Sequence, residues 1–83
     1  MQGYPMNDQQ PYRMLVRHSI VGLKPGAKYK LQFSQIADVF PPGMVDQDIH
    51  PRALADLRAF ADDVGCTVTK DDTLKAFVFV KRS

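Results

Sequence analysis

The clearest pattern of apolar and polar positions in this chain predicts an amphipathic helix over residues 50–64. In this stretch, HPRALADLRAFADDV, apolar residues recur at spacings of three and four, which places them on one face of a helix. The predicted inward residues are Ala53, Leu54, Leu57, Phe60, Ala61 and Val64. Pro51 suits the first helical turn, and Gly65 suits the left-handed position after the helix. We expect this helix to organise the core.

The period of the pattern then changes to two and predicts a β-hairpin. Residues 66–69 form the incoming strand, residues 70–73 form a polar turn, and a second strand follows. The two faces of this last strand hold Phe77 and Phe79 on one side, and Ala76, Val78 and Val80 on the other. One face has to pack on the helix. The other is covered by another element or remains an aromatic surface beside Lys75 and Lys81.

Residues 12–23, YRMLVRHSIVGL, leave two interpretations open. As a helix that ends at Gly22, they place Leu15, Val16, Ser19, Ile20 and Leu23 on one face. The β-branched residues in the same stretch favour a strand instead. We favour the helix.

The middle of the chain predicts shorter elements. The sequence KPGA at residues 24–27 is a turn by its chemistry, because Pro presets φ and Gly accepts positive φ. Alternation of apolar and polar residues predicts a short strand over residues 29–33. Ser34 can cap a helix over residues 34–40, which the following Pro-Pro-Gly sequence ends. Residues 44–49 form a connector.

Length and composition predict one small domain. The chain has 83 residues, of which 45% are hydrophobic, enough for a single core. Residues 1–11 are polar, contain two prolines and show no period, so we expect a disordered tail before a domain at residues 12–83. The apolar runs are too short to span a bilayer, and the N-terminus does not resemble a signal peptide. We expect a soluble cytoplasmic protein.

Catalytic and metal-binding patterns are missing from the sequence. The single cysteine, Cys66, and two separated histidines give no zinc-ligand spacing, and Cys66 is expected to be a small buried residue. His50 is expected at the start of a helix and His18 in solvent. The sequence shows no acid–base pair, activated nucleophile or phosphate-binding glycine loop. We therefore predict a protein that is not an enzyme and needs no cofactor or metal.

The order of the expected elements resembles that of winged helix-turn-helix domains. That order is a helix, a short strand, two helices and a C-terminal β-hairpin, an α+β winged-helix-like fold. The phrase LQFSQIADVF at residues 31–40 looks like the strand that enters the first helix of the motif. By the same resemblance, residues 50–65 lie where the recognition helix would be and residues 66–82 where the wing would be. The long connection from Pro41 to Ile49 departs from the short turn of such motifs.

The alternative fold depends on residues 12–23. If they form a strand, residues 23–28 become a hairpin turn. Two hairpins then flank the long helix in a ββαββ arrangement.

Charge is arranged by segment along the chain. Residues 12–30 hold five Lys and Arg and no acid, whereas residues 34–64 hold six Asp against two Arg. With the resemblance, this predicts a small regulatory protein of bacterial or bacteriophage type that binds nucleic acid, DNA first, through a basic N-terminal segment and a hairpin wing. The predicted contact residues are Arg13, Arg17, Lys28, Lys30, Arg52, Lys70, Lys75 and Lys81. The same cations are equally consistent with an ordinary solvated surface.

The second functional hypothesis is a protein–protein interaction module. A small inhibitor or adaptor of this size can dock on a larger protein machine, including one that handles nucleic acid. The candidate contact residues are Phe40, Met44, Phe77 and Phe79. The first two would belong to an exposed apolar loop. The other two are large aromatics, which are often simply part of a core.

Overall fold

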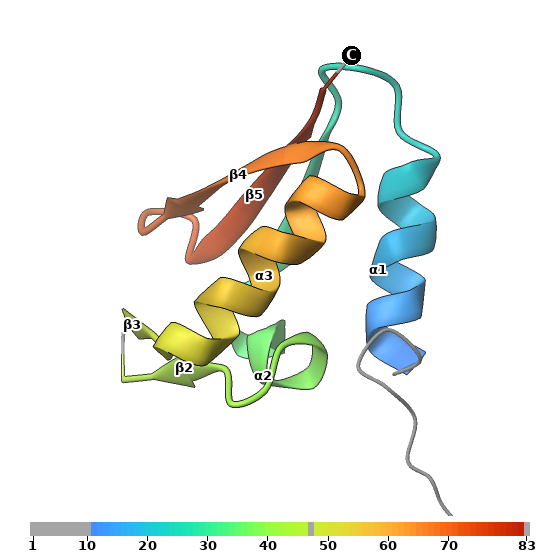
Figure 1. Cartoon of the computed structure of the whole chain (residues 1–83). Helices are drawn as coiled ribbons and strands as arrows, with labels where there is room; N and C mark the ends of the chain where they lie inside the picture. Colours follow the sequence, from blue (N-terminus) through green and yellow to red (C-terminus); the bar gives the residue numbers. More distant parts are fainter. Residues whose placement is uncertain (1–10, 47, 83) are drawn as a thin grey trace, which may run out of the picture.

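The computed structural model describes residues 11–46 and 48–82 as a small α+β domain with three α-helices and a C-terminal β-hairpin (Figure 1). The elements in chain order are α1 (Pro11–Val21), β1 (Lys28–Gln32), the 3-10 helix η2 (Phe33–Gln35), α2 (Ile36–Val39), β2 (Met44–Val45), β3 (Asp48–Ile49), α3 (Pro51–Asp63), β4 (Cys66–Asp71) and β5 (Ala76–Lys81). This confirms the predicted α+β class.

The main sheet has three antiparallel strands, with β5 between β1 and β4. Phe79 of β5 lies opposite Tyr29 of β1 on one side and Val68 of β4 on the other. Side chains alternate between the faces of a strand, so these residues share a face with Leu31 and Phe77. This face packs into the core.

The core lies between this face of the sheet and the helices. The rings of Phe40 and Phe60 meet edge to face at 5.4 Å between centroids, and those of Phe60 and Phe79 at 6.2 Å. Leu57 of α3 and Ile20 of α1 are completely buried beside them. Burial of apolar surface is the main favourable contribution to folding, so α3 has the organising position that its pattern predicts.

The opposite face of the sheet is covered by no other element in the described part of the chain (Figure 1). Lys28 and Lys30 of β1 and Thr67 and Thr69 of β4 are exposed there, and Val78 of β5 is buried between its neighbours. Neither alternative predicted for this face holds, because it is neither covered by another described element nor aromatic. The two phenylalanines of β5 point into the core, where large aromatic rings lose most contact with water.

Residues 12–21 of the ambiguous stretch are helical, in α1, so the ββαββ alternative is wrong. The helix α1 begins at Pro11, which the sequence assigned to the tail; residues 1–10 of that tail lie outside the described residues. The buried face of α1 also differs from the predicted one. Arg13, Val16 and Ile20 are buried, whereas Leu15 is 65% exposed.

The helix α3 begins one residue after and ends one residue before the predicted bounds, and most of its predicted inward face is buried. Nδ1 of His50 accepts a hydrogen bond from the backbone N–H of Arg52 at 3.1 Å, so His50 caps the helix as expected. Leu57, Phe60 and Val64 are buried, but Leu54 is only half-buried.

The segment between β1 and α3 is more ordered than the expected connector. The predicted capping by Ser34 is absent, and the helical segment begins as η2, with the Gln32 N–H donating to Oε1 of Gln35 at 3.2 Å. The peptide bond between Pro41 and Pro42 is cis. Strands β2 and β3 then pair and lead the chain into α3.

Candidate functional site

The predicted nucleic-acid contact Arg13 is buried, with only 7% of its surface exposed. Its Nε and Nη2 donate hydrogen bonds to the Val39 carbonyl oxygen at 3.0 and 2.6 Å, and its guanidinium carbon lies 4.5 Å from the centroid of the Phe40 ring. Val39 ends α2, and a cation at a helix C-terminus is stabilising. The expectation that Arg13 contacts nucleic acid is therefore corrected, because a buried guanidinium does not reach a phosphate.

Two further residues predicted to contact nucleic acid, Arg17 and Lys81, hold α1 in place. Nη1 of Arg17 lies 2.6 Å from Oδ2 of Asp63 in α3, and its guanidinium carbon lies 5.2 Å from the Phe60 ring centroid. Nζ of Lys81 donates to the carbonyl oxygens of Ile20 and Val21 at 3.3 and 3.2 Å. The positive charges of both residues thus serve contacts within the chain.

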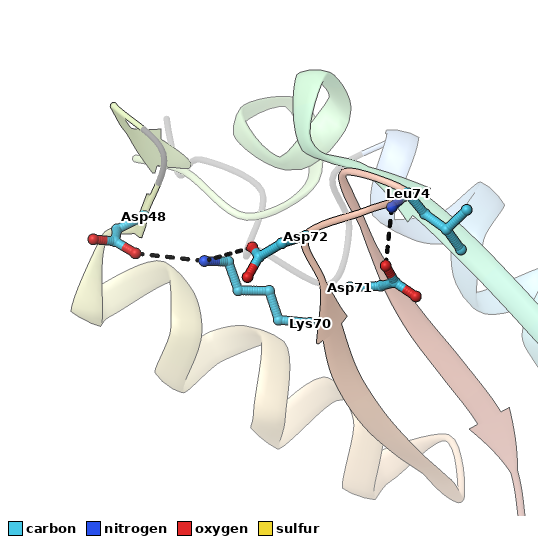
Figure 2. A network of polar contacts seen from close by, with 5 residues as sticks. All are labelled: Asp48, Lys70, Asp71, Asp72 and Leu74. Carbon is cyan, nitrogen blue, oxygen red and sulfur yellow. Dashed lines mark hydrogen bonds and ion pairs between the residues drawn. The ribbon is translucent and has the colours of Figure 1, made fainter.

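Lys70 lies in a network at the end of the hairpin, shown in Figure 2. Its Nζ is 3.2 Å from Oδ1 of Asp72 and 3.4 Å from Oδ1 of Asp48. The pKa of Lys70 is raised, chiefly by its hydrogen bond to Asp72. The charge of Asp72 and the hydrogen bond and charge of Asp48 add to this effect, and desolvation opposes it. Oδ1 of Asp71 accepts from the Leu74 N–H at 2.9 Å and closes the turn. The network ties the hairpin to β3.

The remaining predicted cations lie on separate surfaces. Lys28 and Lys30 belong to the open face of the sheet, whereas Arg52 lies on the outer side of α3, beyond the core. Lys75 is exposed in the hairpin turn, where its φ is 54°. Lys70 and Lys75 line one hollow beside the hairpin turn, together with Asp46, Asp48 and Asp72.

The residues proposed for protein contact are mostly core residues. Phe40 and Phe79 are completely buried, Phe77 is 2% exposed and Met44 is half-buried. The expected exposed loop at Phe40 is wrong, because its ring fills the space between Arg13 and Phe60.

Sequence reasoning missed an exposed apolar surface on α1. Tyr12, Met14, Leu15 and Val21 are 57%, 51%, 65% and 57% exposed. Tyr12 and Leu15 line a groove of about 190 Å³ between α1 and β1, which we call the α1–β1 groove. Its other lining residues are Val16, Tyr29, Leu31, Gln35, Asp38 and Val39. The signal in the sequence was that residues 12–23 contain more apolar positions than one helix face can bury.

The reactive side chains of residues 11–46 and 48–82 give no metal-ligand cluster and a buried thiol. Within these ranges, no three His, Cys, Asp or Glu residues gather in a way that can hold a metal ion. Cys66 is 1% exposed, and burial raises the pKa of its thiol, with Lys81 and Arg82 partly offsetting the rise. None of the helices described is long and apolar enough to cross a membrane.

Comparison of the chain with models of protein families, with curated proteins and with solved structures finds no match.

Proposed function

We propose that this chain is a non-catalytic docking domain that binds a partner protein through the α1–β1 groove. The observation that carries this proposal is the exposure of Tyr12 and Leu15 along a hollow of the surface whose lining is mostly apolar side chains, with Gln35 and Asp38 as its polar members. Single exposed apolar residues are common, but exposed apolar residues that share one groove are typical of interaction sites. Such a domain acts as a small adaptor or inhibitor.

The distribution of charge supports protein docking over nucleic-acid binding. Arg13, Arg17, Lys70 and Lys81 make contacts within the chain. Residues 44–75, which contain the proposed recognition helix and the hairpin turn, hold seven Asp against four Lys and Arg. A surface that follows a phosphate backbone needs an excess of positive charge. Nucleic-acid binding stays a prediction with less support than docking.

The winged-helix resemblance stays part of this proposal. It is supported by the order of the three helices and the C-terminal hairpin. It is compatible with docking, because one fold serves many functions and the function resides in a specific surface.

The proposal is tested by capturing partners with the tagged chain and with two variants. Leu15→Asp places a charge in the groove, whereas Met14→Asp places the same charge on a neighbouring exposed residue that does not line it. We expect a specific partner with the wild type and Met14→Asp, and at least about a tenfold lower yield with Leu15→Asp. Circular dichroism checks that both variants are folded. Equal capture by all three chains would contradict the proposal.

Nuclease treatment and salt separate the two functional hypotheses. Capture through an apolar groove should survive nuclease and change little with ionic strength. Binding through several phosphates should weaken steeply with salt. In a plot of the logarithm of the binding constant against the logarithm of the salt concentration, the slope should be roughly as large as the number of phosphate contacts. Capture that disappears on nuclease treatment would favour the nucleic-acid hypothesis.

A further inference from the structure

We infer that the partner contributes an extended segment, which binds as an added β-strand along the outer edge of β1, where no further strand of the described residues pairs, and alternates apolar with acidic side chains. This inference rests on the proposed docking function and specifies the chemistry of the partner.

The first argument is the hydrogen-bonding capacity of the edge. β1 is an outer strand of the sheet. The Phe33 N–H donates to the Lys75 carbonyl at 2.8 Å and the Ala27 carbonyl accepts from the Lys81 N–H at 2.9 Å, so the backbone hydrogen-bonding groups of these odd-numbered residues face β5. In an antiparallel strand the N–H and C=O of one residue point to the same side, and the side alternates from residue to residue. The N–H and C=O groups of Lys28 and Lys30 therefore point away from β5.

The N–H of Gln32 supports this assignment. It belongs to the same alternating set as those of Lys28 and Lys30, and it donates to Oε1 of Gln35 rather than to β5. The chain itself thus satisfies the last outward N–H of β1. Before it, the N–H and C=O groups of Lys28 and Lys30 point outward, and an extended segment from another protein can pair with them.

The second argument is the position of the groove beside this edge. Tyr29 and Leu31 of β1 line the α1–β1 groove, and Tyr12 and Leu15 of α1 form its other wall. A strand added to β1 continues the same alternation of faces. Every second side chain of the added strand would point towards this wall, and burying an apolar side chain there is favourable.

The third argument is charge, which selects the occupant. The intervening side chains of an added strand would lie on the open face of the sheet beside Lys28 and Lys30, where Asp or Glu form favourable cross-strand pairs. A second copy of this chain would bring lysines against the same lysines, which is unfavourable, and edge lysines commonly prevent such self-pairing. The complementary occupant is an acidic and apolar segment of another protein.

The probes are acetylated and amidated octapeptides that alternate Val or Ile with Asp or Glu. Binding to the full chain is measured by the fluorescence anisotropy of a dye-labelled peptide and by the amide chemical shifts of the protein. We expect the largest shifts at Lys28 and Lys30 and about tenfold weaker binding to Lys30→Glu, because an attractive cross-strand pair becomes a repulsive one. The matched control is Arg52→Glu, which makes the same charge change on the far side of α3 and should bind as the wild type does. A peptide with Lys in place of its acids should recover binding to Lys30→Glu.

Backbone pairing is tested separately with N-methylated peptides. Methylation of the amides that face β1 should abolish binding, whereas methylation of the alternate amides should preserve it. If both methylated peptides bind equally, or if none of the octapeptides binds, strand addition is overturned and Lys28 and Lys30 only protect the edge.

The two proposals fail in different ways. Capture that depends on Leu15 but is unaffected by Lys30→Glu would retain docking in the groove and reject strand addition. Capture that is insensitive to Leu15→Asp would reject the docking function itself.

Discussion

Arg13 shows how one side chain can change role between a sequence and its fold. In a basic segment an arginine is expected in solvent, yet this guanidinium bonds the end of α2 and lies over an aromatic ring. Its planar group donates several hydrogen bonds in one plane and stacks on a ring face, which a lysine ammonium does not do. The buried charge is therefore matched by contacts specific to arginine.

We predict that Arg13→Lys lowers the free energy of unfolding by about 2 kcal/mol, because the second hydrogen bond and the ring contact are lost in a buried site. Urea unfolding measures the change. Arg17→Lys is the control, since the Arg17 side chain is 35% exposed and its ion pair is worth at most about 1 kcal/mol. Equal losses for the two variants would contradict the structural role of Arg13.

The thiol of Cys66 should react slowly in the folded protein. Burial both shields it and raises its pKa, so little thiolate is available at neutral pH. We predict that iodoacetamide labels it at least about tenfold more slowly than in 6 M urea. Because the folded pKa lies above the unfolded one, the thiol contributes stability at neutral pH that is lost as pH rises through the folded pKa. Labelling at equal rates in both states would show that the site is open.

At the scale of elements, the connection between α2 and α3 is built around a close backbone contact. Gly43 has a φ of 80°, and a Cβ placed on it would lie 2.7 Å from Cα of Ala37. Its N–H donates to the Phe40 carbonyl, and its carbonyl accepts from the His50 N–H at 2.9 Å. Gly43 therefore determines how the chain turns into α3.

Gly43→Ala should destabilise the domain more than Gly65→Ala does. Both positions have positive φ, which costs about 1–2 kcal/mol for alanine. Only Gly43 adds a steric clash with backbone, since nothing lies within 4 Å of a Cβ at Gly65. Thermal and urea unfolding of the two variants give the comparison. A Gly43→Ala variant no less stable than Gly65→Ala would show that this contact relaxes easily.

The core face of α3 predicts that substitutions of two leucines, Leu57 and Leu54, lower the free energy of unfolding by different amounts. Leu57→Ala should cost about 2–5 kcal/mol, because it opens a cavity at a fully buried position. Leu54→Ala should cost clearly less, since Leu54 is only half-buried. Urea unfolding of both variants measures this order, and a stable, fully folded Leu57→Asp variant would contradict the core assignment.

At the scale of the whole molecule, contacts between distant segments hold the two ends of the domain together. Lys81 of the last strand bonds the C-terminal carbonyls of α1, and Arg17 of α1 pairs with Asp63 of α3. Several basic side chains of the first and last segments thus make hydrogen bonds or ion pairs within the chain. This reduces the charge available to an external polyanion.

Lys81→Met should therefore lower the free energy of unfolding by about 1 kcal/mol, through loss of hydrogen bonds and of a cation at a helix C-terminus. Lys28→Met, on the open face of the sheet, should change it by less than about 0.5 kcal/mol. Urea unfolding in low salt resolves the difference. Equal effects would indicate that Lys81 does not stabilise α1.

Most of the secondary structure could be predicted from the chain, whereas most of the candidate site could not. The repeat of apolar residues, Pro51 and Gly65 determine α3, and alternation determines β4 and β5. These patterns involve residues that are close in sequence, so they can be recognised without knowledge of the fold. The exposure of a given cation depends instead on distant groups such as the Val39 carbonyl and Asp63.

The sequence by itself thus determined the α+β class, the long helix and the hairpin. Only the tertiary structure decided the rotation of α1 about its axis, which buries Arg13 and exposes Leu15. An apolar-rich helix has more than one face that it can bury, and the choice follows from the groups it meets, here Val39 and Phe40. The α1–β1 groove is a consequence of that choice, because it joins residues from two elements that pack together only in the folded chain.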